Sequence, residues 1–371
     1  RSPALVLLVF NRIEVRAGAW KRLLAPLNLL VFFAVTLPWF VGLCLVHPDF
    51  VQYGLIRESF HRFTSAKAFD RSAPFYFYLL IVAGLFFPWS LLLPGAGLAR
   101  WKKRWAMNSA DRLCLIWSVV VVVFFSLSQS KLPGYILSVA VASGILVARI
   151  FDKAMAAPEG TPARLVNRAT VVFVCVCLLA AVVTLVGASQ IRVLAKPLRI
   201  LAGDAERLGE GVLPIAGLLL ALAAFGFVAR YRRSASLCFL CLALFPPLAV
   251  IAGLGMFEVL YDAKSGRRLA AQLSALPKET ELACLRCFPN GLLFYLGRTV
   301  TLISKDGSEL TSNYIIYCLE KNPQPPKQIV RLADLANWVA SRKGPVFLIA
   351  PPMDQEVIQA VVGTRNASVQ T

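Results

Sequence analysis

Seven long windows of the sequence contain no charged residue, and they restrict the chain to folds that exist inside a membrane. Each is close to the ~20 residues that a helix needs to cross a hydrocarbon core of ~30 Å. A helix satisfies all of its own backbone hydrogen bonds, which lipid cannot do for it. The windows are residues 23–48, 72–99, 113–129, 132–148, 169–191, 211–229 and 234–257.

An eighth apolar segment, residues 3–10, is too short to cross a membrane alone and begins almost at Arg1. A secretory signal peptide needs a longer apolar stretch and a small-residue cleavage site, and the sequence shows neither. We therefore expect the chain to be the C-terminal part of a longer membrane protein. The hydrophobic share of 58% agrees with that class rather than with a soluble domain.

The distribution of lysine and arginine predicts how these spans are oriented. One set of loops carries 16 basic residues against four acids and comprises residues 11–26, 95–112, 149–168 and 230–236. The alternating set carries nine against six and comprises residues 48–73, 128–134 and 188–210. Because cytoplasmic loops are enriched in lysine and arginine, the first set is predicted to be cytoplasmic. The net charge of +19 is therefore mostly a topology signal, and no nucleic-acid partner is expected.

The pattern changes near Phe257, after which charge and periodicity are typical of a small soluble domain. Strands are predicted at residues 282–288, 299–304 and 346–350, and helices at residues 267–276, 331–342 and 355–362. Strands that alternate with helices indicate an α/β fold. The predicted fold class is an α-helical polytopic membrane domain, residues 1–257, with seven full spans plus a partial one. An extramembrane α/β domain, residues 258–371, follows it.

The cysteines and histidines do not indicate a catalytic or metal site. Six of the nine cysteines lie in or beside apolar windows, where cysteine behaves as a small hydrophobe. A strand through both Cys284 and Cys287 would put these thiols on opposite faces, and either could pair with Cys318 in an oxidising compartment. With only His47 and His61, the chain offers no metal-ligand cluster. No cofactor is evident in this sequence. A divalent metal bound by residues upstream of Arg1 is the alternative.

Ion pumps and most transporters keep ionisable residues at mid-membrane, and the interiors of these windows contain none. Attention therefore moves to the outer loops. In the first, Lys131 interrupts an apolar run, and Pro133 and Gly134 supply turn chemistry for a tight hairpin at residues 128–134. Either this lysine extends its ammonium to the interface from a short loop, or it is held there to meet an anion.

The second outer segment is the loop at residues 48–73, which is predicted to form an amphipathic helix from Tyr53 onward. Its apolar side contains Tyr53, Ile56, Phe60 and Phe63, and its polar side contains Arg57, Glu58, His61 and Arg62. One interpretation is a plain surface helix with a Glu58–Arg62 pair. The other is that Arg57, Arg62, Arg71 and Lys131 converge on a lipid phosphate, which guanidinium and ammonium groups bind well.

Four segments in order resemble a known family. They are "DFVQYGLIRESFHRF", "SAPFYFYL" followed by "PWSLLLPG", "FFSLSQSKLPGYILS" and "FPNGLLFYLGRTVTLI". The series resembles the bacterial aminoarabinose-transferase-like branch of the dolichyl-phosphate-mannose-protein mannosyltransferases, which are membrane glycosyltransferases of the C superfamily. The resemblance covers almost the whole chain and is weakest between residues 152 and 231. It implies a donor in which a polyprenyl (undecaprenyl) phosphate carries the sugar.

The resemblance also implies residue roles. Glu58, Arg62 and Phe63 match a Glu-His-x-x-Arg-Phe segment, although Ser59 replaces its histidine and His61 lies two residues on. Arg71, Pro74 and Tyr78 match the entry to the next span. Lys131, Leu132, Pro133 and Tyr135 match a Lys-Leu-Pro-x-Tyr hairpin, in which Ser138 replaces a later proline. The implied site for the lipid phosphate and donor comprises Arg57, Glu58, His61, Arg62, Arg71, Tyr78, Lys131 and Tyr135.

The family's catalytic acid is expected upstream of Arg1, so this chain alone is expected to lack it. Asp49, Glu58 and Asp70 are the acids of the long outer loop, and none is assigned as the base. The predicted reaction transfers a sugar to lipid A, or to another glycan or protein acceptor, at the outer face of a bacterial inner membrane, with the C-terminal domain periplasmic. The alternatives are a flippase for lipid-linked sugars, which the uncharged spans disfavour, and a non-catalytic scaffold whose outer domain binds a partner.

Overall fold

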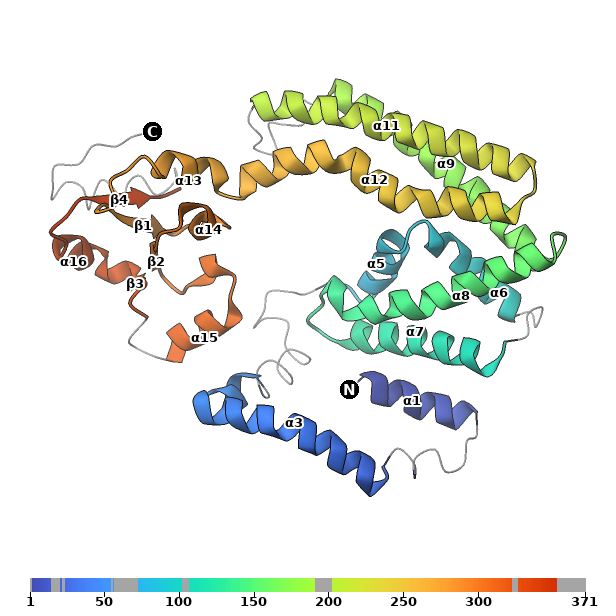
Figure 1. Ribbon diagram of the computed structural model, residues 1–371, viewed down its shortest axis with the longest axis horizontal. Helices are drawn as coiled ribbons and strands as arrows, with labels where there is room; N and C mark the ends of the chain where they lie inside the picture. The colour runs from blue at the N-terminus through green and yellow to red at the C-terminus, as the bar shows by residue number, and fades with distance from the viewer. Residues whose placement is uncertain are drawn as a thin grey trace. The chain divides into compact units, whose positions relative to one another are not determined.

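The computed structural model describes residues 2–14, 21, 24–54, 56, 73–101, 107–190, 202–321 and 326–351 (Figure 1). The chain divides into two compact units, Arg1–Gly255 and Met256–Thr371. The first is helical and the second contains the strands. Each unit is described by itself.

Six helices in the described part of the chain are long and apolar enough to cross a membrane. They are α3 (Pro26–Val46), α7 (Ser109–Leu127), α8 (Leu137–Ala156, preceded by the 3₁₀ turn η3, Pro133–Ile136), α9 (Thr161–Ser189), α11 (Ala202–Tyr231) and α12 (Ala235–Lys264). The prediction of a polytopic helical membrane protein is confirmed. The short apolar segment near the start forms α1 (Ser2–Ile13), which packs against α7.

The window at residues 72–99 is broken rather than one continuous helix, so the predicted seven spans are reached only if this bent pair counts as one span. It forms α5 (Phe77–Leu85), the 3₁₀ turn η2 (Trp89–Leu92) and α6 (Leu93–Trp101), with a bend of 112° at the break. Pro88 lies in the break, where a proline has no N–H to donate and its ring clashes with the preceding turn. Ser90 Oγ donates to the carbonyl of Ala83 at 2.8 Å and so satisfies an acceptor near the end of α5.

The helix α7 begins four residues before its predicted window. Asn108 caps it, since its side chain accepts a hydrogen bond from the Asp111 N–H at 2.7 Å. The first turn therefore contains Asp111, which is buried and pairs with Arg149 of α8 at 3.5 Å. Glu14, just after α1, pairs with Arg112 at 2.5 Å. Charged residues at this end of the helices are thus matched by opposite charges on neighbouring elements.

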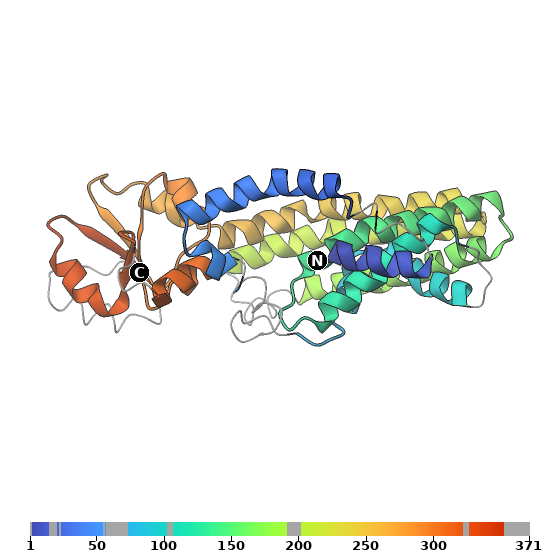
Figure 2. The same ribbon diagram turned by 90° about the horizontal axis from the view of Figure 1, so that it is seen from below.

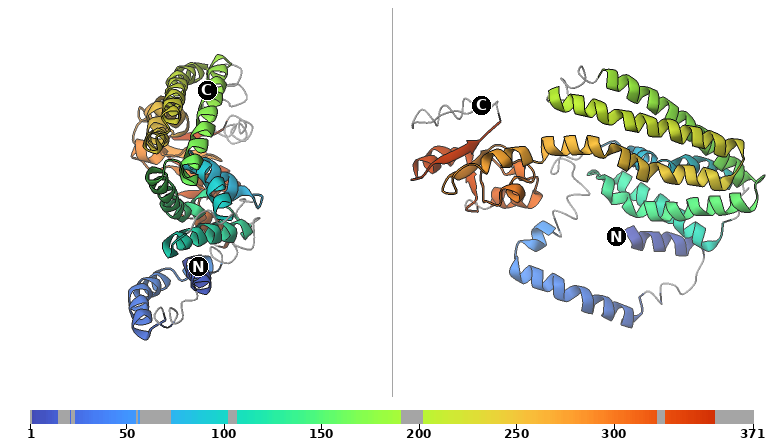
Figure 3. Two further views of the ribbon diagram at one scale, coloured as in Figure 1. Left: turned by 90° about the vertical axis from the view of Figure 1, so that its right-hand side faces the viewer. Right: turned by 45° about the horizontal axis from the view of Figure 1, so that its top comes forward.

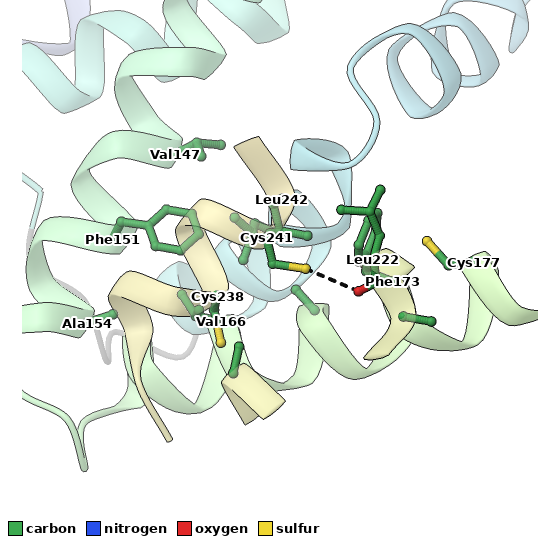
Figure 4. Packing of buried hydrophobic residues seen from close by; sticks show 14 of the residues in the cluster. Val147, Phe151, Ala154, Val166, Phe173, Cys177, Leu222, Cys238, Cys241 and Leu242 are labelled. Carbon is green, nitrogen blue, oxygen red and sulfur yellow. Dashed lines mark hydrogen bonds between the residues drawn. The ribbon is translucent and has the colours of Figure 1, made fainter. Parts of the chain in front are cut away.

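The main core lies among α8, α9, α11, α12 and η2. α9 and α11 run side by side (Figures 1 and 3), and small residues at the contact let their backbones approach closely. A methyl group at Gly226 would lie 2.7 Å from Val174. Figure 4 shows Cys241 donating to the carbonyl of Leu222 at 3.5 Å, with Cys177 and Cys238 in the same cluster. These three cysteines are buried and pack as small hydrophobes, as predicted, whereas Cys44 and Cys114 are half-buried and Cys175 is exposed.

A second core in the helical unit surrounds Tyr78 of α5. It joins Val6 of α1, Val121 of α7, Ile136 of η3 and Val139 of α8. This cluster holds the hairpin between α7 and α8 against α5, which is the part of the fold that carries the candidate site.

The C-terminal unit contains a parallel four-stranded sheet in the order β3-β2-β1-β4, whose strands are labelled in Figure 1 and seen from below in Figure 2. The strands are β1 (Glu281–Leu285), β2 (Thr301–Ser304), β3 (Ile329–Arg331) and β4 (Val346–Ile349). The helices are α13 (Arg267–Leu273), α14 (Leu292–Leu296), α15 (Asn313–Lys321) and α16 (Leu335–Ala340), with 3₁₀ turns η4 (Ser308–Leu310) and η5 (Leu332–Asp334).

Both faces of this sheet are covered, and β1 alternates between them with a period of two. Leu282 and Cys284 pack in a cluster with α13 and α14. Ala283 and Leu285 pack in a separate cluster with α16. Burial on both faces explains why β1 is apolar from Leu282 to Leu285 rather than alternately polar.

Several predicted elements of this unit differ from the structure in length. The strand predicted at 282–288 ends at Leu285, because Arg286 adopts a left-handed φ of 50° and the chain leaves the sheet there. The helix predicted at 331–342 exists only as α16, since β3 and η5 occupy its first residues. β3, α14 and α15 were not predicted, and the helix predicted at 355–362 lies outside the described residues.

Replacing Phe173 by alanine is expected to destabilise the helical unit. The ring is fully buried and contacts Phe87 and Phe245, each at a centroid distance of 5.7 Å. Removing it leaves a cavity that should cost about 3 kcal/mol. We expect a clearly lower Tm for detergent-solubilised protein, whereas Val183→Ala on the exposed side of α9 should leave Tm nearly unchanged. Equal Tm values for the two variants would contradict this packing.

Candidate functional site

The hairpin between α7 and α8 holds a buried lysine. Lys131 is 7% exposed, and its Nζ donates to the carbonyl of Ser128 at 2.5 Å. Ser128 Oγ in turn donates to the carbonyl of Ser130 at 3.1 Å. Lys131 thus does not extend away from the hairpin, as a solvent-seeking lysine would. Its ammonium has three donors, and the Ser128 carbonyl is its acceptor among the described residues.

Tyr78 fixes this hairpin from a distant part of the chain. Its hydroxyl donates to the carbonyl of Leu132 and accepts from the Leu132 N–H, both at 3.1 Å. The Tyr78 ring is fully buried and lies 6.4 Å from that of Phe125. The structure therefore gives Tyr78 a positioning contact with the hairpin backbone at Leu132, the residue that follows Lys131.

Two hydroxyls of the hairpin are buried and have no hydrogen-bond partner within the described part of the structure. They are Ser130 Oγ and Tyr135 Oη. The Tyr135 ring packs on Phe125 at a centroid distance of 5.1 Å, which fixes its direction. A buried polar group without a partner costs about 1–3 kcal/mol. A buried ammonium together with two unsatisfied hydroxyls is an arrangement that an anionic oxygen would satisfy.

Five of the eight predicted site residues lie outside the described residues: Arg57, Glu58, His61, Arg62 and Arg71. The predicted amphipathic helix is described only at its start, where residues 51–54 and 56 are helical. Its convergence with Lys131 stays a prediction. Tyr78, Lys131 and Tyr135 are described: Tyr78 and Tyr135 lie in one cluster, and Tyr78 bonds to Leu132, the residue after Lys131.

No group of three or more His, Cys, Asp or Glu residues that could hold a metal ion occurs among the residues for which the structure gives positions. His47 directly follows α3 as its C-cap. The structure therefore adds no candidate for a metal ligand set to those weighed from the sequence.

An apolar cavity of about 520 Å³ lies among α5, α6, α7 and α8. Its apolar lining includes Leu79, Leu115 and Leu146. Its polar groups are the Asp111–Arg149 pair and the hydroxyls of Ser118 and Ser143, which lie 3.4 Å apart. Uniformly apolar windows give no sequence signal for such a cavity.

A smaller cavity of about 130 Å³ connects this region to the hairpin. It is lined by Pro133 and Ile136, and it shares Val82, Val139 and Ser143 with the larger one. The two cavities thus share part of their lining, and the smaller one reaches Pro133, two residues after Lys131. Their combined size suits an apolar chain rather than a compact polar molecule.

The fold and these features define a multi-span helical membrane protein with a buried cation next to an apolar cavity. Comparison with known proteins gives a more particular likeness. The chain is 36% identical over 135 residues to the undecaprenyl phosphate-alpha-4-amino-4-deoxy-L-arabinose arabinosyl transferase of Erwinia tasmaniensis, covering 35% of this chain and 24% of that protein. The same enzyme of Photorhabdus laumondii is 39% identical over 112 residues, covering 30% and 20%.

The structural likeness extends over nearly the whole chain. The crystal structure of ArnT from Cupriavidus metallidurans bound to undecaprenyl phosphate matches with a TM-score of 0.71 at 24% identity, covering 97% of this chain and 61% of that one. No family model matches the chain. The chain spans about a quarter of the length of the curated relatives that it matches. The predicted resemblance to the aminoarabinose-transferase-like family is confirmed.

Removing the Tyr78 hydroxyl is expected to loosen the hairpin. Tyr78→Phe keeps the buried ring but leaves the N–H and the carbonyl of Leu132 without their partner. A cost of about 1.4 kcal/mol should speed amide exchange of the peptide covering residues 128–136 about tenfold. Tyr76→Phe, at a half-exposed tyrosine two residues away, is the matched control. Hydrogen exchange at the control rate in Tyr78→Phe would show that this contact does not hold the hairpin.

Proposed function

We propose that this chain is part of a glycosyltransferase that moves a sugar from an undecaprenyl-phosphate donor to an acceptor at the outer face of a bacterial inner membrane. The observation that carries the proposal is the buried Lys131 ammonium in a hairpin that also holds two buried hydroxyls without a partner among the described residues. It occurs in a fold like that of a protein whose crystal structure contains undecaprenyl phosphate. Lipid A is the preferred acceptor of the proposal, and other glycans or proteins are the alternatives.

The proposed role of the hairpin is to bind the phosphate of the donor. Lys131 supplies a positive charge, and Ser130 and Tyr135 supply hydroxyl donors. When the bond from sugar to phosphate breaks, the leaving phosphate gains negative charge. Fixed donors that point at this charge therefore stabilise the transition state more than the ground state. Tyr78 contributes by holding the hairpin in place.

The proposed partners of the hairpin are the polar residues of the long outer loop. Arg57, Arg62 and Arg71 would add guanidinium groups, which bind phosphate oxygens in pairs. Glu58 and His61 would orient these groups or contact the sugar. This assignment rests on the resemblance, since all five residues lie outside the described part of the chain.

The cavity is proposed to hold the polyprenyl chain of the donor. Its apolar lining starts beside Pro133 and continues past Val139 to Leu146. An isoprenoid chain gains contact with these side chains, and its phosphate then lies at the hairpin. The membrane lipids around the helices are the other apolar partners of this unit.

The catalytic carboxylate is proposed to lie in a part of the enzyme that this chain does not include. Sugar transfer with inversion needs a base for the acceptor hydroxyl, and Asp49, Glu58 and Asp70 are not assigned to that role. The curated relatives extend far beyond the matched region. In this proposal the second unit is a periplasmic α/β domain, as the lysine and arginine distribution predicts.

Substituting the proposed phosphate ligands should reduce transfer. We expect Lys131→Ala and Arg62→Ala each to lower kcat/KM about 10- to 100-fold, the equivalent of one lost charge-assisted contact of about 1.5–3 kcal/mol. Lys153→Ala, at the opposite end of α8, removes a lysine without touching the site. The measurement is sugar transfer to lipid A in membranes that contain the full-length protein. Transfer at the control rate by both variants would refute the phosphate site.

Filling the cavity should impair long-chain donors selectively. Ser143→Phe places a ring where the two cavities share their lining, so KM for undecaprenyl-phosphate sugar should rise at least about tenfold. A donor with a short prenyl chain should be used almost as well as by the unmodified protein. Leu179→Phe, at an exposed position of α9, is the control. An equal loss for short and long donors would argue against a tail site.

A further inference from the structure

The C-terminal unit carries a Cys-x-x-Cys motif at a particular place in its sheet. In the strand order β3-β2-β1-β4, β2 and β3 lie on one side of β1, and β4 lies on its other side. The direction of winding therefore reverses between β1 and β4. In open parallel sheets, the carboxyl ends of such a strand pair form the crevice in which sites are found. Cys284 is the penultimate residue of β1, and Cys287 follows the end of that strand.

The two thiols lie on the same face, contrary to the opposite faces that a longer strand would impose. The left-handed Arg286 turns the chain after Leu285, and its N–H donates to the carbonyl of Ile303 at 2.9 Å. The Cys287 Sγ then donates to the carbonyl of Ile349 at 3.5 Å. Ile349 is the residue of β4 that pairs with Cys284 in the sheet register.

This register brings the sulfurs within reach of each other. Paired strands lie about 4.8 Å apart, so a group bound at Ile349 is a near neighbour of Cys284. Both cysteines also pack in one apolar cluster with Leu273 and Leu292. The hydrogen bond with Cys287, and then burial, raises the pKa of the Cys284 thiol. All nine cysteines of the structure are thiols.

We propose that Cys284 and Cys287 form a reversible disulfide, which makes the end of β1 a thiol–disulfide exchange site. Cys287 is half-buried and reachable, whereas Cys284 is fully buried. Cys287 is therefore the thiol that meets an external oxidant, and Cys284 is the resolving thiol. The oxidant is a disulfide of low molecular weight or of a partner protein.

The exchange balances in two steps. The Cys287 thiolate attacks one sulfur of the oxidant, whose S–S bond breaks and releases the other sulfur as a thiolate. Cys284 then loses its proton and attacks the Cys287 sulfur. This forms the internal disulfide and releases, as a thiolate, the sulfur of the oxidant that was bonded to Cys287. In total the two cysteines lose two protons and two electrons, and the oxidant becomes two thiols.

Trypsin makes the test direct, because it cuts after Arg286, between the two cysteines. The full-length protein in detergent is reduced, treated with oxidised glutathione, alkylated with iodoacetamide and digested without reductant. We expect residues 279–286 and 287–298 to appear as one linked pair, lighter by two hydrogen atoms than the separate peptides. Added reductant should separate them.

Two variants distinguish a Cys284–Cys287 disulfide from a disulfide to Cys318. In Cys318→Ser the linked peptides should still form. In Cys287→Ser, whose new side chain is no larger than the original one, they should be absent. Two results would overturn the proposal: both peptides fully alkylated after oxidation, or Cys284 or Cys287 linked to the Cys318 peptide. The outcome does not depend on sugar transfer, so it leaves the proposed function untouched in either case.

Discussion

The candidate site of the helical unit depends on how the buried ammonium of Lys131 is held at the turn between the apolar helices α7 and α8. A lysine surrounded by apolar side chains is costly unless acceptors meet it. Here the Ser128 carbonyl meets it from within the turn, and Tyr78 holds the next residue, Leu132, by two hydrogen bonds. Tyr78 can do so because it lies in the first turn of α5, which packs against α7 and η3. The broken span, the hairpin and the ammonium are therefore one structural feature.

The same arrangement connects polar and apolar recognition. Pro133, two residues after Lys131, lines the smaller of two cavities that share Val82, Val139 and Ser143. An amphiphile with an anionic head could satisfy the ammonium and fill the apolar space together. Neither the lysine nor the cavity alone would select such a molecule, because a lysine binds many anions and an apolar cavity accepts many chains. The proposed specificity for a lipid phosphate comes from their continuity.

The apolar windows predicted the spanning helices well, since charge-free runs of that length leave the backbone few other options. They did not predict the break at Pro88, because proline alone does not decide it: Pro38, Pro214 and the pair Pro246–Pro247 lie inside continuous helices. Lys131 stood out from the sequence as a charge at an interface, whereas Tyr135 was named only through the family resemblance. The contact between Tyr78 and Leu132 joins residues 54 positions apart, and spacing within one segment could not reveal it.

In the C-terminal unit, the apolar runs predicted three strands, but the first was predicted to continue three residues beyond its end at Leu285. Arg286 stops β1 by a backbone conformation that its residue type does not announce, and this reversed the expected placement of the two thiols. β3 has three residues and escaped detection because so short a run shows no clear period.

The central claim is that Lys131 is held in order to meet a lipid phosphate. Its most direct test is a structure of the full-length protein with undecaprenyl phosphate bound. The account predicts a phosphate oxygen about 2.8 Å from Lys131 Nζ, with the polyprenyl chain along Val139 and Leu146. A phosphate bound elsewhere, with the ammonium still directed at Ser128 alone, would contradict it.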